Sequence, residues 1–246
     1  GAQQDLKALQ PVSQRISLGF CYLAIGERAG LSPAQARHIM SLVHQSGIIE
    51  QLPLEEGLIT PSSEMLPGWH IPDWQPEPDI ILPAQLSLHY HLPVELHAMA
   101  AKLQQLLATQ GCQLTLHFHP QKNWQDYPLL AQADLIMGDR LIGEAPMFTL
   151  ESWLRLDPMW PILSGAAGWK MLLTQLDDLQ RYPDLEQRHQ RLKTLYQQLM
   201  LDAVITPLFN YRYQVSAPPD VEGIRLNAWG WFDFSRAWIP PPVDIV

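Results

Sequence analysis

The chain has 246 residues, of which 47% are hydrophobic and 17% are charged. It is therefore long enough to bury a substantial core and is neither a disordered tail nor a fibrous repeat. Its formal net charge is -9. Because a protein surface that binds nucleic acid needs clustered positive charge, this part of the protein is not expected to bind DNA by itself. No stretch approaches the roughly 20 apolar residues of a membrane-spanning helix, so no membrane partner is expected.

A strand, a charged turn and a helix open the chain. Residues 16–25 form an alternating and then continuous apolar run, which predicts a largely buried strand. Residues 26–28 follow as a turn, and Ser32 and Pro33 supply an N-cap and a first-turn proline for a helix that ends near Gly47.

Residues 48–85 are rich in proline and contain Trp69 and Trp74. Proline interrupts long helices and strands, whereas tryptophan contributes most to stability when it is buried. We interpret this segment as an ordered surface crossover that the two tryptophans fix in place, with a linker as the alternative.

Strands and helices alternate in the next part of the chain. The apolar spacing predicts strands over 86–92, 112–119 and 133–138, with helices over 94–111 and 123–132 between them. Short connections of this kind imply right-handed parallel crossovers. The sequence therefore predicts an α/β fold, with a mostly parallel, doubly wound sheet and helices on both faces.

Three further helices are expected over 149–156, 168–181 and 184–203, followed by a strand over 203–211. The tail, 223–246, is rich in aromatic residues but contains few basic ones. We interpret it as packing against the core rather than as a platform on which nucleic-acid bases stack.

No catalytic or cofactor motif is visible. The chain lacks the nucleophile elbow Gly-x-Ser-x-Gly, the phosphate loop Gly-x-x-x-x-Gly-Lys-Ser/Thr, the dinucleotide fingerprint Gly-x-Gly-x-x-Gly and the zinc motif His-Glu-x-x-His. We therefore expect a protein that is not an enzyme and that needs no cofactor.

Two His-x-His pairs are weak candidates for metal ligands, since strand periodicity places each pair on one face of neighbouring strands. The alternative is a partly solvated sheet face, and no cysteine or carboxylate lies at ligand spacing, so no metal is expected. Cys21 and Cys112 lie in apolar contexts and are interpreted as reduced core thiols, with one disulfide as the alternative. The histidine pairs are His89/His91 and His117/His119.

Charged residues directly after apolar strands are the best candidates for a ligand site, because open α/β sheets bind ligands at the carboxyl ends of their strands. A guanidinium at such a position is a plausible anchor for a phosphate or carboxylate, although a solvated loop charge is the alternative at each. The candidates are Glu27 and Arg28 after the first strand, Asp139 and Arg140 after strand 133–138, and Tyr211 and Arg212 on the returning strand.

Two segments carry a resemblance to a known family. The crossover contains Leu66-Pro67-Gly68-Trp69-His70, and the tail contains Arg225-Leu226-Asn227, Gly230-Trp231-Phe232-Asp233-Phe234 and Ala237-Trp238. With the order of predicted elements, these residues resemble the carboxyl-terminal half of the SgrR-type transcriptional regulators. The tail block is the specific part of the resemblance, which extends over most of the chain.

The resemblance implies a cytoplasmic regulator associated with sugar-phosphate stress. Such regulators join an amino-terminal winged-helix DNA-binding domain to a domain similar to family 5 extracellular solute-binding proteins. In that architecture two lobes of the periplasmic-binding-protein-like type II fold close over a solute. This chain is then expected to hold a leading segment, 1–14, the second lobe, 15–203, and a return segment, 204–246. The first lobe and the DNA-binding domain are expected to lie outside it, so the solute cleft is shared with a lobe that this chain lacks.

Two other functions compete with a sensor that responds to a small metabolite such as a sugar phosphate. The same fold serves periplasmic receptors that deliver peptides or other solutes to a transporter. An interaction module without a small ligand is the third hypothesis, and a contiguous exposed patch of Trp229, Trp231 and Trp238 would favour it.

Overall fold

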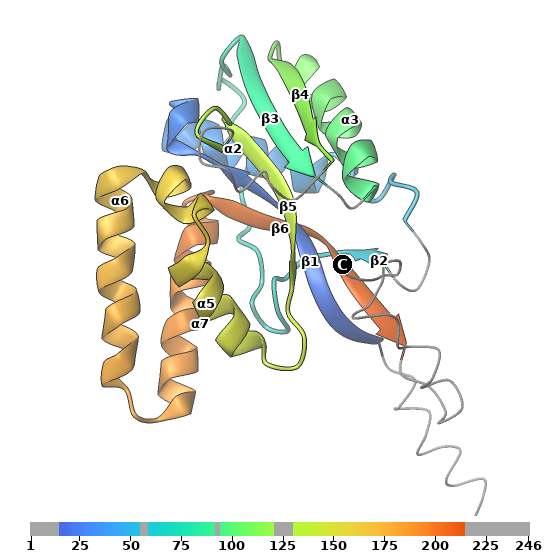
Figure 1. The fold of residues 1–246 in the computed structure, drawn as a ribbon. Helices are drawn as coiled ribbons and strands as arrows, with labels where there is room; N and C mark the ends of the chain where they lie inside the picture. Colours follow the sequence, from blue (N-terminus) through green and yellow to red (C-terminus); the bar gives the residue numbers. More distant parts are fainter. Residues whose placement is uncertain (1–14, 55–58, 92–93, 121–129, 215–246) are drawn as a thin grey trace, which may run out of the picture. The chain divides into compact units, whose positions relative to one another are not determined.

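A computed structural model of the chain describes residues 15–54, 59–91, 94–120 and 130–214 (Figure 1). The chain divides into two compact units. The larger unit comprises Gly19–Leu54 and Thr60–Asn210, and the smaller comprises Gly1–Leu18, Glu55–Ile59 and Tyr211–Val246. Most of the smaller unit, including the aromatic tail, lies outside the described residues, and the account below concerns the larger unit unless stated.

Six strands form one sheet in the order β2-β6-β1-β5-β3-β4. The pairs β3–β4 and β3–β5 are parallel, whereas β1 and β5 are antiparallel, with Gly19 opposite Leu141 and Ile25 opposite Leu135. The strands are β1 (Arg15–Ile25), β2 (Ile59–Pro61), β3 (Gln85–His91), β4 (Gln113–His119), β5 (Leu135–Leu141) and β6 (Ile205–Gln214).

The α/β fold class is confirmed, but the sheet is mixed, because the first strand does not share the direction of the parallel set β3, β4 and β5. Short crossovers constrain consecutive strands to run parallel, as they do here from β3 to β4. The long connection 26–84 between β1 and β3 imposes no such direction. It brings the chain back so that β5 pairs with β1 in the opposite sense.

The helices confirm most of the expected elements. Helix α2 (Pro33–Gln45) begins with a reciprocal capping box between Ser32 and Gln35. The expected helix 123–132 lies mostly outside the described residues, and α6 begins earlier than expected because it continues through a break at Gly165. The others are α3 (Glu95–Ala108), α5 (Pro146–Leu156), α6 (Met159–Asp178) and α7 (Leu185–Leu201), with the short 3-10 turns η2 (Glu27–Ala29) and η4 (Leu179–Arg181).

The core lies between the sheet and its helices. Trp160, Tyr22 and Tyr196 are among the largest fully buried side chains. Trp69 and Trp74 are 5% and 4% exposed, which confirms that the proline-rich crossover is ordered against the core. Figure 1 shows α6 and α7 side by side, with α5 packed against them.

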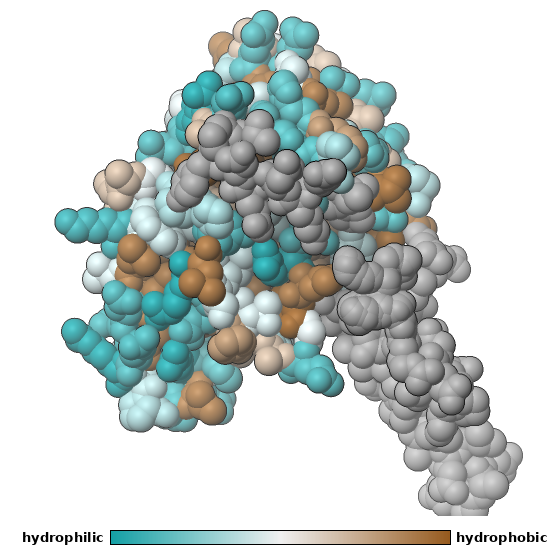
Figure 2. Space-filling view, in the orientation of Figure 1, coloured by the Kyte–Doolittle hydropathy of each residue, from teal (hydrophilic) through white to brown (hydrophobic). Residues whose placement is uncertain are grey.

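Both cysteines are buried and neither is in a disulfide, as expected of reduced core thiols. On the face drawn in Figure 2, hydrophobic side chains form separate patches among polar ones. In the described part of the chain, no helix is both long and apolar enough to cross a membrane.

Candidate functional site

The carboxyl ends of β3, β4 and β5 lie at one edge of the sheet, because these strands run parallel. We call it the carboxyl-end edge and define it by His91, His119 and Leu141, the last residues of the three strands. Because β1 is antiparallel to β5, its own carboxyl end lies at the opposite edge. Strand topology makes the carboxyl-end edge the first candidate for ligand binding.

Asp139 and Arg140 lie inside β5, so their expected place in a loop after the strand is wrong. The strand continues to Leu141 because β1 supplies paired backbone as far as Gly19. A Cβ atom at Gly19 would overlap the Arg140 carbonyl oxygen, which explains why glycine stands where the two backbones approach so closely.

The Arg140 guanidinium is held by partners within the chain. Its Nη2 donates to Asp157 Oδ2 at 3.3 Å, and its Cζ lies 5.1 Å from the centroid of the Trp153 ring. Asp157 also accepts from Trp153 Nε1 at 3.0 Å and from the Met159 backbone N–H at 2.9 Å. The side chain of Arg140 is 29% exposed, so a ligand at this edge would meet a guanidinium that is already neutralised.

An aromatic cluster surrounds this ion pair. The Trp153 ring contacts Tyr22 at 5.2 Å, Trp160 at 5.0 Å and Tyr196 at 6.3 Å between ring centroids. Burial raises the pKa of Tyr22 and of Tyr196 well above the ordinary value, so both hydroxyls stay protonated. Tyr22 donates to Met159 Sδ at 3.4 Å. The cluster is a packed support for Arg140 rather than an open pocket.

Asp139 lies close to a buried histidine. The Asp139 Oδ1 atom is 3.8 Å from His91 Nε2, and the two side chains are 16% and 4% exposed. This pair joins the ends of β3 and β5, which are parallel neighbours. It places a carboxylate and an imidazole at the carboxyl-end edge.

The other three histidines of the His-x-His pairs form a stack, which we call the imidazole column (His89, His117 and His119). The register pairs His89 with His117 and His91 with His119. The His89 ring lies 4.4 Å from that of His117 and 5.1 Å from that of His119, nearly parallel to both. Within the described residues, no group of three His, Cys, Asp or Glu side chains is arranged to hold a metal ion.

Hydrogen bonding and burial fix the protonation of the column. His89 Nδ1 lies 2.9 Å from His119 Nε2, so one ring carries the proton and the other accepts it. Burial, with the neighbouring imidazoles, lowers the pKa of His89 to about 4, and burial lowers the pKa of His119. At neutral pH these two rings are therefore uncharged.

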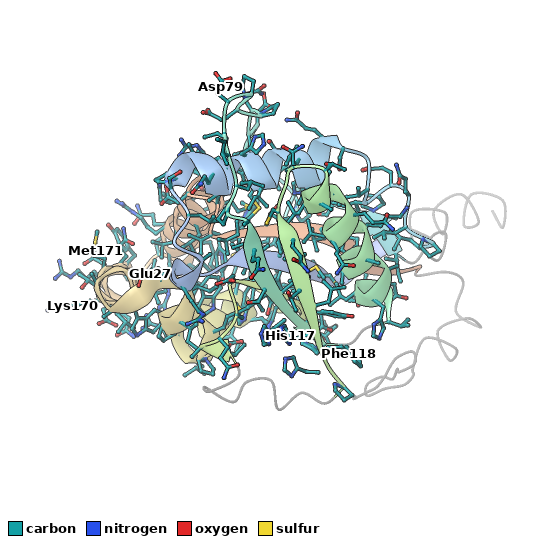
Figure 3. The ribbon with its side chains drawn as sticks, turned by 90° about the horizontal axis from the view of Figure 1, so that it is seen from above. Glu27, Asp79, His117, Phe118, Lys170 and Met171 are labelled. Carbon is teal, nitrogen blue, oxygen red and sulfur yellow. The ribbon has the colours of Figure 1, made fainter. Side chains whose placement is uncertain are left out.

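Glu27 and Arg28 lie in η2 at the opposite edge of the sheet. Arg28 Nε is 3.9 Å from Asp134 Oδ1, and the Arg28 side chain is 59% exposed. The register sets Phe20 opposite Arg140 and Ile25 opposite Leu135, so these edges are separated by five strand residues, roughly 17 Å. Glu27 lies beside α6, far from His117 in Figure 3. The structure does not bring the two arginines together.

The Glu27 carboxylate lies against Gly165, where α6 breaks. Gly165 has φ 70° and ψ 173°, and a Cβ atom there would overlap the carboxylate. The second part of α6 begins directly after this residue, so an acidic group faces the amino end of a helical segment. Glu27 therefore has a structural role that the sequence did not indicate.

Tyr211 and Arg212 belong to β6, in the part of the strand assigned to the smaller unit. Tyr211 is half-buried, and the side chain of Arg212 lies outside the described side chains. Their expected role at the ligand site stays a prediction.

Sequence reasoning missed Asp157, which holds Arg140. The available signal was its position: Asp157 is followed by proline directly before α6, and aspartate is a common helix-capping residue. That signal indicates a helix start and contains no information about Arg140, which lies on another element.

Hollows on the described surface differ in their position relative to the carboxyl-end edge. One of about 480 Å³ lies at the amino end of β4, away from the carboxyl-end edge, and is lined by Gln104 and Cys112 among others. One of about 290 Å³ lies beside the first turn of α3, directly after β3, and is lined mainly by apolar groups. The second is near the edge that topology favours and is at the small end of ligand-pocket volumes.

Sequence relatives were found for nearly the whole chain. It is 52% identical over 242 residues to Uncharacterized protein YbaE of Escherichia coli K12, which covers 98% of this chain and 43% of that protein. It is 26% identical to HTH-type transcriptional regulator SgrR of Yersinia enterocolitica, over 98% of this chain and 42% of the regulator. The chain thus spans less than half the length of these relatives. No protein-family model matches it.

Solved structures with a similar fold include NikA and two peptide-binding proteins. NikA from Brucella suis, in complex with Fe(III)-EDTA, has a TM-score of 0.64 at 14% identity and covers 89% of this chain and 51% of NikA. The murein tripeptide binding protein MppA of Escherichia coli has a TM-score of 0.56 at 17% identity, over 88% of this chain and 47% of MppA. The oligopeptide-binding protein AppA of Bacillus subtilis has 0.61 at 12% identity, over 84% of this chain and 48% of AppA.

The two kinds of similarity agree with the resemblance that the sequence carried. The regulator matches the chain from end to end in sequence, and the binding proteins share its mixed α/β architecture. Taken together, they show that this chain is similar in sequence to part of the SgrR regulators and similar in fold to NikA and MppA.

Proposed function

We propose that this chain is the solute-sensing part of a bacterial transcriptional regulator. One observation carries the proposal: the same residues match a named DNA-binding regulator over 98% of the chain and have the fold of proteins that bind solutes. In a regulator, we expect a solute-binding fold to act as the sensor. The named relative is a regulator and the solved neighbours are binding proteins, which favours binding over catalysis.

The carboxyl-end edge is the site we propose for the solute. It combines the Asp139 carboxylate, the partly exposed Arg140 guanidinium and the apolar hollow beside α3. The family resemblance suggests a small metabolite such as a sugar phosphate. Among the described side chains at this edge, the Arg140 guanidinium is the group that a phosphate would meet. Its Nε is buried and has no hydrogen-bond partner among the described residues.

Glu27 and Arg28 remain candidates for a separate contact, together with Tyr211 and Arg212. Arg28 is the more exposed of the two arginines, which makes it easier to reach and less selective. Because roughly 17 Å separates the two edges, one small solute would not contact both Arg28 and Arg140. The four residues are therefore tested separately from Asp139 and Arg140.

The proposed mechanism is closure of two lobes around the solute. In it, residues 15–203 provide the second lobe, residues 204–246 return toward the first, and a first lobe and a winged-helix domain outside this chain complete a cytoplasmic regulator. Solute binding shifts the population of the two lobes from the open to the closed conformation, and this shift changes how the regulator binds DNA. A tenfold bias requires a differential affinity worth only about 1.4 kcal/mol.

A transport receptor is the second candidate, because the solved neighbours include peptide-binding proteins. That function would place the protein in the periplasm and pair it with a permease. A protein-docking module without a solute is the third, and the tryptophans that would indicate it lie outside the described residues.

The test is calorimetric titration of the full-length parent protein against sugar phosphates and short peptides in parallel. Saturable binding of a sugar phosphate that is weakened at least about tenfold by Arg140→Met supports the proposed sensor and its site. The matched control is Arg28→Met, which removes the same charge at the opposite edge. Binding of peptides alone would support the transport-like function, and no binding of either would contradict a small-solute sensor.

A further inference from the structure

The imidazole column has a feature that ligand binding does not explain. His89 on β3 lies between His117 and His119 on β4, with nearly parallel rings at 4.4 Å and 5.1 Å. Parallel strands are about 4.8 Å apart, so the register that aligns His89 with His117 places the rings at stacking distance. The column therefore connects β3 to β4 through side chains as well as through the backbone.

The hydrogen bond within the column requires at least one of its two rings to be neutral. His89 Nδ1 and His119 Nε2 are 2.9 Å apart, which requires one donor and one acceptor. When both rings are protonated, two N–H donors face each other and the bond is lost. Two positive charges would then lie about one strand spacing apart, and one of them would be on His89, which is only 4% exposed.

The carboxylates near the column are already engaged. Asp134 is the carboxylate that acts to raise the pKa of His89. Its Oδ2, however, already accepts from the Ser87 backbone N–H at 2.8 Å and from Ser87 Oγ at 3.2 Å. Its Oδ1 faces Arg28 at 3.9 Å. Asp134 is thus oriented by other donors rather than by the column.

The other charged side chains that the structure describes near the column are engaged with groups outside it. Along the same face of β3, His91 faces Asp139 at 3.8 Å. By strand alternation Arg140 shares the face of β5 that adjoins His89, and it is paired with Asp157. Helix α3 covers the other face, where Tyr90 contacts His97, and its Glu95 and Lys102 belong to that side.

Among the described strands, β4 lies at the end of the sheet order and pairs with β3. Helix α3 also packs against β4. Four of its seven residues are exposed. An element with few attachments responds strongly when one of them is lost.

We propose that the imidazole column is an acid-sensitive attachment of strand β4, which holds the strand when His89 and His119 are neutral and releases it when both are protonated. The inference is independent of the proposed function, because it concerns only how β3 and β4 are joined. The lowered pKa values of His89 and His119 agree with it, since both groups resist protonation in the closed form.

Hydrogen–deuterium exchange measured by mass spectrometry on the whole chain tests this, at about pH 7.5 and about pH 5 with EDTA present and with rates corrected for intrinsic exchange. We expect peptides over Gln113–His119 to exchange at least about tenfold faster at the lower pH, and peptides over Leu185–Leu201 to show a much smaller increase. Equal protection of β4 at both values would overturn the proposal.

Two variants separate the column from a general effect of acid. In the double variant His117→Gln/His119→Gln the acid response of β4 should be markedly smaller, because the partner of His89 in the hydrogen bond no longer takes up a proton, although the buried His89 remains. His44→Gln is the matched control: His44 is also a neutral buried histidine but lies on α2 against Thr206, so β4 should keep its response. A double variant that retains the response would contradict the proposal. If it fails to fold, His117→Gln alone, at an exposed position, should reduce the response.

Discussion

The two edges of the sheet hold similar charges in different ways. At the carboxyl-end edge Arg140 is enclosed by Asp157 and the Trp153 ring, and Asp139 faces a buried histidine. At the opposite edge Arg28 is 59% exposed and only approaches Asp134. A charge that follows an apolar run in the sequence can therefore be part of the packed structure or nearly free in solvent. The neighbouring elements decide which, and the strand itself does not.

Removing the Asp157 carboxylate, which pairs with Arg140, should have the largest effect on the free energy of unfolding. Asp157→Ala leaves a partly buried guanidinium and the Trp153 indole N–H without their acceptor, and we expect a loss of about 3 to 5 kcal/mol in the free energy of unfolding. Urea unfolding measures it. The double variant Arg140→Met/Asp157→Leu should recover much of the loss, and a loss below about 1 kcal/mol for Asp157→Ala would show that the pair is no more than a surface ion pair.

The second largest effect on stability is expected from acid, because burial lowers the pKa of histidines in the folded chain. Burial lowers the pKa of His44 to about 4 from an ordinary 6.5, so the unfolded chain binds the proton more tightly than the folded one. Stability is then fully present above about pH 6.5 and falls as pH drops toward about 4, by about 3 kcal/mol for this residue. Urea unfolding between these pH values checks the decline, and His44→Gln should make it shallower. An unchanged slope in that variant would show that His44 titrates normally.

The break in α6 should be sensitive to a single methyl group. Gly165→Ala forces an alanine to φ 70° and places its Cβ in the Glu27 carboxylate, so we expect a loss of about 2 kcal/mol. Gly168→Ala is the control in the same helix, because its φ is not positive and its nearest contact would be Ser164 at 3.3 Å. Thermal unfolding compares the two. Equal effects would indicate that the Glu27 contact does not constrain α6.

The smallest effect is expected at the exposed edge. Arg28→Ala removes an ion pair of 3.9 Å with a mostly solvated side chain, and its effect on stability should stay within about 0.5 kcal/mol. Chemical unfolding at low and high salt checks this. A loss as large as that of Asp157→Ala would remove the contrast between the two edges.

Much of the fold follows from local pattern. The apolar alternation, the Ser32 cap and the glycines and prolines predicted nearly all the helices and strands that the structure describes, and the short crossovers predicted the parallel pairing of β3, β4 and β5. Strand periodicity also placed the histidines on adjacent strands. The antiparallel direction of β1 was not predictable, because a long connection permits either sense.

The sequence by itself determined the fold class of the protein, because a large apolar fraction and alternating elements indicated an α/β fold. Only the tertiary structure decided the surroundings of each candidate side chain. It separated Arg28 from Arg140, paired Arg140 with Asp157, and placed His89 within hydrogen-bonding distance of His119. The physical reason is that secondary structure depends on neighbours in sequence, whereas charge pairing and protonation depend on groups that only the assembled sheet brings within a few ångströms.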